Sequence, residues 1–418
     1  MLFLLHWFTS HHVKEGRTMK LFWILSALAA VTLLQAEEIN EKWETNENCN
    51  ACHMDISKRW ETSRHANSHF SKNDLFKKSL EYMVRKNPTL ILDEMKVECA
   101  KCHNPRITKK TVEEKDKYLL LMGIEENKQE MQKVLNTENM KNGINCVVCH
   151  NIDEIHLDKS KGSEGMNSVK FGEQGTMFGP FDDADSPYHK TAQRAHFSSD
   201  DPTLCFICHH SASNKHGVEV YATGKEYDAS GSAEGCRDCH MSGKFEGFAS
   251  NYSKSGGTPK PRMVREHRFA SVDNSNIMIN YIDVKSSTRK GKFILTITNK
   301  SPHFIPTGYG LREIILHVDY FDKADKKVGE ARKVLAAKWL DAKGEETIPH
   351  LATSKAKDTR LAGTTTQDYL FDVPQGANYA KYTFSYRLIS EKMAKTIGVT
   401  DPFFLKEYIF SERRIHLD

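Results

Sequence analysis

Alternating apolar and polar positions mark the chain from about residue 275 onward. A period of two residues is typical of strands that bury one face. Five segments show this period, namely 277–286, 291–299, 312–321, 364–373 and 380–389. Turn residues separate these segments, and the closing residues 401–418 fit either a helix or a last strand. The pattern predicts an all-β, immunoglobulin-like sandwich over residues 271–418.

The preceding part of the chain shows no such alternation and is mostly polar, with long loops. An amphipathic helix is predicted over residues 116–137, and another over 55–70. A third is indicated at Ser186 and Pro187, a favoured pair for an N-cap and a first helical residue. Long polar loops are unusual around a conventional core, so something other than side chains is expected to fill the interior.

The N-terminus carries an uncharged apolar run at 21–34, which follows Lys20 and ends shortly before Ala36 and two glutamates. This arrangement predicts a secretory signal peptide over residues 19–36. A membrane span needs about 20 apolar residues, so we expect an exported, soluble, periplasmic chain. An uncleaved anchor that keeps the protein at the membrane is the alternative. Residues 1–18 precede a complete signal and indicate an over-long start.

Charge changes this picture little. Hydrophobic residues make up 39% of the 418 residues and charged residues 27%, which is a globular composition. The formal net charge is +4, and it is spread along the chain rather than concentrated in one tail. The balance favours weak docking to acidic partners and argues against nucleic-acid binding.

Cysteine usage identifies the chemistry. All ten cysteines fall in five C-x-x-C-H motifs. Disulfides do not require a histidine after every second cysteine, and zinc ribbons use C-x-x-C pairs two at a time, which five pairs cannot satisfy. C-x-x-C-H is instead the attachment signature of c-type haem, in which the histidine binds the iron. The predicted attachment residues are Cys49, Cys52, Cys99, Cys102, Cys146, Cys149, Cys205, Cys208, Cys236 and Cys239. The predicted proximal iron ligands are His53, His103, His150, His209 and His240.

These motifs predict five covalently bound c-type haems, whose macrocycles would supply the missing apolar interior. We therefore expect a mainly α and loop pentahaem cytochrome domain over residues 37–270, followed by the β-sandwich. If each iron is closed on both faces, five further ligands are needed. His65 and His69 lie four residues apart on one face of the predicted helix 55–70, and His65 is favoured.

Four other histidines complete the candidate distal ligands. His189 and His196 would lie two turns apart on the predicted helix that starts at Ser186, and His189 is favoured. His267 follows a break rich in proline and glycine, and His303 lies in a turn between two predicted strands. A structural histidine is the alternative for each of them. The remaining histidines are expected to be surface or satisfied residues, namely His156, His216, His317, His350 and His416. His210 follows the motif histidine His209 and cannot bind the same iron, so it is either a surface or structural histidine or reaches another haem or a propionate.

The motifs and their surroundings resemble multihaem c-type cytochromes of the cytochrome c-554 type. This group is related to octahaem hydroxylamine oxidoreductases and pentahaem ammonia-forming nitrite reductases. The resemblance spans about residues 49–270 and rests on CNACHMDISKRWETSRHA, VECAKCH, INCVVCH, SPYHKTAQRAHFSSDDPTLCFICH, and GCRDCHM with a later EHRF. It implies distal-ligand roles for His65, His189 and His267.

A second resemblance covers SPHFIPTGYGLREIILHVDYFDKADKKVG, which is similar to the opening of a β-sandwich attached to some of these cytochromes. Pro302 stands where that family commonly has a glycine, which leaves the role of His303 open.

Closely spaced haems predict electron transfer. The leading interpretation is a periplasmic carrier between a quinol-oxidising membrane partner and a terminal reductase, with the β-sandwich as a docking module. One alternative is a reductase or oxidase of a small nitrogen or sulfur compound at one open haem. Related nitrite reductases typically replace the motif histidine of the active haem with lysine, whereas all five motifs here end in histidine. A haem-bearing assembly subunit is a third interpretation.

Overall fold

A computed structural model of the protein describes residues 46–106, 129, 132–133, 135–138, 140–157, 164–173, 175–198, 201–252 and 259–417. The predicted start segment and signal peptide lie outside these residues, as does most of the predicted helix 116–137. All of the described residues belong to one compact unit.

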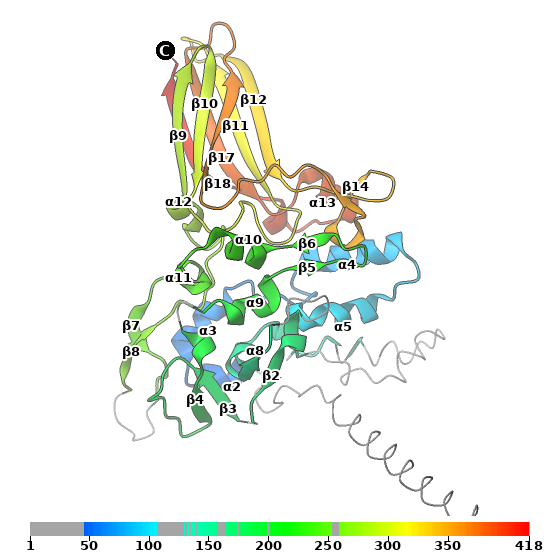
Figure 1. The fold of residues 1–418 in the computed structure, drawn as a ribbon, viewed down its shortest axis with the longest axis vertical. Helices are drawn as coiled ribbons and strands as arrows, with labels where there is room; N and C mark the ends of the chain where they lie inside the picture. The colour runs from blue at the N-terminus through cyan, green and yellow to red at the C-terminus, as the bar shows by residue number, and fades with distance from the viewer. Residues whose placement is uncertain are drawn as a thin grey trace, which may run out of the picture. The chain divides into compact units, whose positions relative to one another are not determined.

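The part of the chain that carries the motifs consists of short helices and two-stranded sheets (Figure 1). Its helices are α2 (Asn46–Asn50), α3 (Met54–Glu61), α4 (Asp74–Lys86), α5 (Leu92–His103), α8 (Cys146–His150), α9 (Thr203–His209), α10 (Thr223–Ser230) and α11 (Cys236–His240). Its paired strands are β1 (Ile152–Ile155) with β2 (Val169–Phe171), β3 (Thr176–Gly179) with β4 (Lys190–Gln193), β5 (Ala212–Ser213) with β6 (Glu219–Tyr221), and β7 (Phe245–Phe248) with β8 (Pro261–Val264). The expected mainly α and loop character holds in part, because these small sheets accompany the helices.

Most C-x-x-C-H motifs form the last turn of a helix. Helices α5, α8, α9 and α11 each end at their motif histidine. A helical turn places two cysteines that are three residues apart on the same face. Polar side chains cap two of these helices: Asn145 accepts a hydrogen bond from the Val148 amide (3.3 Å), and Asp238 accepts one from the Gly235 amide (3.0 Å). In these four motifs, the helical turn therefore places both cysteine side chains on the same side of the helix.

One predicted helix is shorter than expected. Helix α3 ends at Glu61, and residues 62–70 form turns. His65 and His69 therefore do not share a helix face. The Ser63 hydroxyl accepts a hydrogen bond from the Ala66 amide (3.1 Å), and such side-chain bonds to the backbone compete with helix continuation.

The prediction of a helix that starts at Ser186 was wrong. The structure has strand β4 and a single 3-10 turn, η4 (Ala195–Phe197), in its place. The Ser186 hydroxyl accepts a hydrogen bond from the Tyr188 amide (3.2 Å), which closes a local turn before β4 pairs in parallel with β3. Ser-Pro pairs also initiate turns, so the N-cap signal was ambiguous.

The C-terminal part contains two main antiparallel sheets and one small sheet (Figure 1). The three-stranded sheet has the order β16 (Thr365–Asp372), β10 (Lys292–Asn299), β9 (Ile282–Arg289). The four-stranded sheet has the order β12 (Lys327–Ala336), β11 (Glu313–Phe321), β17 (Tyr379–Arg387), β18 (Glu407–His416). The small sheet joins β14 (Glu346–Thr347), β13 (Trp339–Leu340) and β15 (Ser354–Lys355), and the helices of this part are α12 (Ile277–Tyr281), α13 (Glu391–Ile397) and α14 (Pro402–Leu405).

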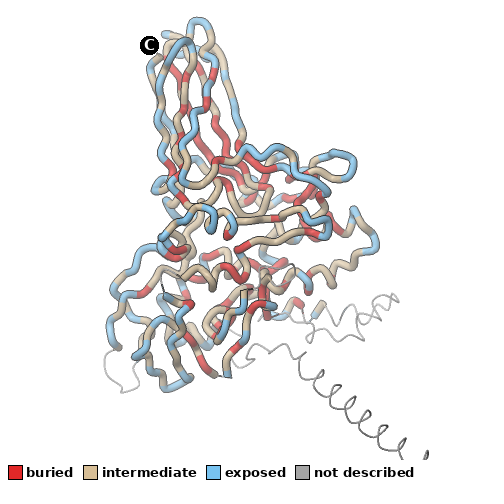
Figure 2. Tube along the Cα trace, viewed as in Figure 1, coloured by how far each residue is buried: buried red, intermediate tan, exposed pale blue. Residues whose placement is uncertain are grey.

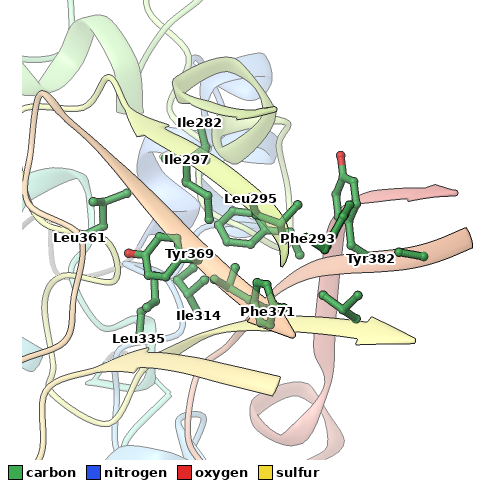
Figure 3. Close-up of a cluster of buried hydrophobic side chains, with 14 of the residues drawn as sticks. Ile282, Phe293, Leu295, Ile297, Ile314, Leu335, Leu361, Tyr369, Phe371 and Tyr382 are labelled. Atoms are coloured by element: carbon green, nitrogen blue, oxygen red, sulfur yellow. The ribbon is translucent and has the colours of Figure 1, made fainter. Parts of the chain in front are cut away.

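A shared apolar core joins the two main sheets, with buried and exposed positions alternating along their strands (Figures 2 and 3). The Phe293 ring of β10 lies 6.5 Å from the Tyr320 ring of β11 and 6.3 Å from the Tyr382 ring of β17. Each large apolar side chain buried in this way contributes roughly 1.5–3 kcal/mol. The predicted two-sheet arrangement is therefore present.

Four of the five predicted strands match β10, β11, β16 and β17 to within a residue or two. The segment 277–286 instead begins as helix α12 before β9, and the closing segment becomes α14 followed by strand β18. Strand β12 was missed, because it lies at a sheet edge and exposes many polar side chains.

The C-terminal part also packs directly on the motif-bearing part. Leu80 and Met83 of α4 share an apolar cluster with Met393 and Ile397 of α13. The Arg85 guanidinium donates a hydrogen bond to the Ile397 carbonyl (3.0 Å). The two parts therefore share a core.

Candidate haem-binding site

A connected cavity of about 2320 Å³ runs through the motif-bearing part and reaches the β-rich part. Sites for single small molecules are typically about 300–1,000 Å³, so this cavity is large enough for several such groups. All ten motif cysteines lie in the described residues, are free thiols and line this cavity.

Ten described histidines line the same cavity. Five are the motif histidines. The other five are His65, His189, His267, His303 and His350. The cavity therefore contains one further histidine for each motif histidine.

Four motif histidines face a second histidine across the cavity. The ring centroids of His53 and His189 are 6.4 Å apart, and those of His65 and His209 are 6.2 Å apart. The distances are 6.4 Å for His150 with His267 and 6.3 Å for His240 with His303. The ring planes in these four pairs are 22–38° from parallel.

This spacing fits two imidazoles on opposite sides of one metal ion. A ligating nitrogen lies about 2 Å from its metal and roughly 1 Å from the centre of its ring, which gives about 6 Å between the two ring centres. Direct stacking or a hydrogen bond between the rings would bring the centroids closer. Two thiols and a facing pair of imidazoles at each site thus match the donor set of a covalently bound haem.

Backbone carbonyls orient most of these rings through Nδ1. A carbonyl oxygen only accepts hydrogen bonds, so each bonded Nδ1 carries the proton and Nε2 keeps its lone pair for a metal. Among motif histidines the pairs are His53 with Ala249, His150 with Phe178 (2.7 Å) and His240 with Ala270 (2.9 Å). Among facing histidines they are His189 with Lys190 (3.0 Å), His267 with Arg265 (2.9 Å) and His303 with Phe304 (3.0 Å).

Burial keeps these imidazoles neutral. It lowers the pKa of His65 to about 3, and it lowers the pKa of His103, His150 and His209 to about 4. A neutral ring is the form that binds a metal ion.

The attachment cysteines of different motifs lie in contact with one another. Three pairs of thiols lie within hydrogen-bonding reach, namely Cys49 with Cys146, Cys205 with Cys236, and Cys102 with Cys208. Cys149 of the third motif also lies near Cys205 and Cys208 of the fourth motif. Groups attached to neighbouring motifs would therefore lie close together.

Two arginines add positive charge inside the cavity. Arg312, just before β11, lies near His209, His240 and His303 and lowers the pKa of each, after the larger effect of burial. Arg64 lies near Arg312 and pairs with Asp273 at 3.2 Å. Guanidinium groups are well suited to bind carboxylates, such as those that a haem carries.

Two candidate distal ligands lie outside the cavity. Both ring nitrogens of His69 have protein partners, because Nδ1 contacts the Ser71 hydroxyl (2.7 Å) and Nε2 contacts the Leu135 carbonyl (3.0 Å). His196 is 8% exposed and does not line the cavity. His210 likewise uses both ring nitrogens, toward the Ser211 hydroxyl (3.2 Å) and the Asp228 carboxylate (3.1 Å), which favours the structural alternative for this residue.

His350 was missed by the sequence analysis. It lies in the 3-10 turn η5 (Pro349–Leu351) of the β-rich part, within no motif and in no recognised repeat. The sequence around it reads TIPHLA and carries no signal of ligation.

Among the helices of the described residues, none is long and apolar enough to cross a membrane. A family model described as outer membrane cytochrome MtrC/MtrF-like, domains II/IV, matches residues 84–252. No curated protein sequence matches the chain.

A solved structure has a similar fold. The crystal structure of a penta-heme cytochrome c552 from Thermochromatium tepidum aligns with a TM-score of 0.67 at 18% identity, covering 89% of this chain and 98% of that one. The putative ApaA protein from Bordetella pertussis aligns with 32% of this chain and 89% of its own at 13% identity, but its TM-score of 0.17 supports no argument. The motifs, the family match over residues 84–252 and the similar fold together support a multihaem c-type cytochrome with a β-rich C-terminal region.

Proposed function

We propose that the protein is an exported electron-transfer cytochrome that carries five covalently attached c-type haems. Every motif supplies two thiols and an imidazole to the cavity, and the cavity offers one further histidine for each motif. The Thermochromatium tepidum protein of similar fold is described as a penta-heme cytochrome, which agrees with this count. When bound, each haem supplies a one-electron iron couple.

The facing pairs of histidines are the single observation that carries this proposal. Four irons would be held between His53 and His189, His65 and His209, His150 and His267, and His240 and His303. An iron with an imidazole on both faces has no free position for a substrate. The pairs therefore favour a carrier over an enzyme at these four sites.

Contacts between attachment cysteines suggest the order of the sites. Cys49 and Cys146 bring the first motif to the third, and Cys149 brings the third to the fourth. The fourth motif contacts the fifth through Cys205 and the second through Cys208. We infer a path that runs from the first site through the third and fourth and divides toward the second and fifth.

In the cell, the protein is proposed to transfer electrons between a quinol-oxidising membrane partner and a terminal reductase. The predicted signal peptide supports a periplasmic location, whereas the matching family description raises association with the outer membrane. The β-rich part is proposed to do more than dock partners, because His303 lines the cavity from it. An enzymatic reaction of a small nitrogen or sulfur compound would need one iron without a second imidazole.

Haem counting tests the proposal directly. The holoprotein, purified after export, is expected to carry five haems per chain by mass spectrometry and by the haem-to-protein ratio. Replacing one motif, for example Cys146→Ala with Cys149→Ala, should lower the count by one. A native count below five would contradict the proposal.

A further inference from the structure

The second motif, CAKCH at 99–103, is the one whose histidine has no partner in the four ring pairs above. The ring of His103 is held on two sides. The ring of Phe76 stacks on one face of the His103 ring, with 4.0 Å between the ring centroids. The Ser68 backbone forms a hydrogen bond with the His103 ring. The ring of His103 nevertheless lines the cavity.

His350 is the remaining cavity histidine. It lowers the pKa of His103 through their mutual repulsion, after the larger effect of burial, so the two rings lie near one another. Burial lowers the pKa of His350 itself to about 4, which keeps it neutral. Its Nδ1 is buried without a hydrogen-bond partner among the described residues.

The turn that carries His350 is fixed from the motif-bearing part. Asn214, next to strand β5, is 7% exposed, and its amide donates to the carbonyls of Pro349 and Ala352, both at 2.8 Å. These two carbonyls flank His350 on either side. Asn214 therefore sets the position of the turn relative to the cavity.

We propose that His350 is the distal ligand of the haem attached at Cys99 and Cys102, and that Asn214 is its positioning residue. This inference rests on the proposed five-haem function. The β-rich part then supplies two distal ligands, His303 and His350, to sites at both ends of the divided path. It is an integral part of the haem-binding unit, and removing it would open two irons.

His350 differs from three other distal histidines in its unbonded Nδ1. Hydrogen bonding at Nδ1 raises the basicity of a ligating imidazole. His189, His267 and His303 have such a bond, whereas His350 lacks one. With the haem bound, His350 would therefore be a less basic ligand than these three histidines.

Electron paramagnetic resonance (EPR) of the oxidised holoprotein tests the assignment. His350→Ala is expected to keep five haems and to convert one of them from low spin to high spin. Asn214→Ala should give a mixed population of high and low spin at the same haem. His69→Ala is the matched control: this buried histidine lies outside the cavity, and its loss should leave every haem low-spin.

Two further measurements keep the assignment falsifiable if His350→Ala fails to accumulate. His350→Met should retain a low-spin iron but raise the potential of one haem, because a thioether ligand favours the ferrous state. In the unmodified protein, a high-spin signal from one haem in five would overturn the assignment. So would five low-spin haems in His350→Ala.

A haem count below five would instead overturn the proposed function, so the two failures can be told apart.

Discussion

The imidazole rings of His240 and His303 lie 6.3 Å apart, with their planes 27° from parallel. His240 ends the last C-x-x-C-H motif, whereas His303 lies in the turn between strands β10 and β11. Nδ1 of each ring forms a hydrogen bond with a backbone carbonyl. The partner is the Ala270 carbonyl for His240 and the Phe304 carbonyl for His303. The His303 ring of the β-rich part is therefore oriented by a backbone carbonyl in the same way as the motif histidine His240. The contacts that hold the His303 loop in place are open to test.

Glu226 of α10 holds the loop that carries His303 through hydrogen bonds. Its carboxylate is 6% exposed and accepts hydrogen bonds from the Phe304 amide (3.1 Å), the Thr307 hydroxyl (2.6 Å) and the Arg360 guanidinium (2.9 Å). Glu226→Ala removes these three hydrogen bonds, whereas Arg360 keeps its ion pair with Asp358 (2.9 Å), so we expect the free energy of unfolding to fall by about 1–3 kcal/mol. Denaturant unfolding of the holoprotein measures this.

The control for Glu226→Ala is Lys225→Ala, also on α10, which breaks an exposed ion pair with Glu219 of β6. Exposed pairs contribute about 0–1 kcal/mol, so its unfolding midpoint should barely change. Equal losses in the two variants would contradict the role given to Glu226.

Gly143 supports the turn that carries His65. Its φ is +56°, and a Cβ there would lie 2.6 Å from the His65 carbonyl oxygen and would also overlap the Ser68 hydroxyl. Gly143→Ala is therefore expected to displace His65 and to produce a partly high-spin haem in the EPR spectrum. Gly217→Ala shares the positive φ, +78°, but its Cβ would meet nothing within 4 Å.

Gly217→Ala should cost about 1 kcal/mol from backbone strain alone, and it should leave the haem spectrum unchanged. If Gly143→Ala behaved like Gly217→Ala in both stability and spectrum, the packing argument for His65 would fail.

Arg312 brings a positive charge near His209, His240 and His303. A nearby cation favours the ferrous iron over the ferric iron, since reduction removes one positive charge. Arg312→Gln should therefore lower the midpoint potentials of the fourth and fifth haems in a spectroelectrochemical titration. Arg289→Gln, on the exposed end of β9, should leave all potentials in place. An unchanged titration for Arg312→Gln would contradict the placement of this charge.

The ion pair between Asp358 and Arg360 is expected to make the stability of the protein depend on pH. Burial raises the pKa of Asp358, but hydrogen bonds from Arg360 and Lys355 outweigh burial and lower the pKa to about 2. An unfolded aspartate has a pKa of about 3.9. The stabilisation is therefore fully present above roughly pH 5 and is lost as the pH falls toward 2.

The comparison for this prediction is Asp358→Asn. The native protein should unfold at higher denaturant concentration than the variant at pH 6, and the gap should close between about pH 4 and pH 2. A gap that stays constant over this range would show that the carboxylate charge plays no part.

Sequence reasoning is most specific where the chemistry is local. The C-x-x-C-H motif contains both cysteines and one ligand, so the attachment residues could be predicted without a fold. Strand β10 could be predicted because burial on one face imposes a two-residue period over its length, and the second half of β11 shows the same period. The edge strand β12 buries only two of its ten residues, so its apolar period was weak.

Distal ligation could be predicted only in part, because it joins segments far apart in the chain. His65 faces the fourth motif rather than the first motif, which it follows directly in sequence. His350 has no sequence signal, since Asn214 and the cavity determine its position rather than its neighbours in the chain. Spacing alone also could not separate His65 from His69, because helix α3 ends before both of them.

The central claim is that every haem iron in this protein is held between two histidines. Quantitative EPR of the fully oxidised holoprotein tests it most directly, with spins counted against five haems per chain and repeated after adding nitrite, sulfite or hydroxylamine. The account predicts five low-spin ferric haems and no spectral change with any of the three compounds. A high-spin signal equal to one haem, shifting when one of them is added, would contradict it and would indicate an open iron that binds substrate.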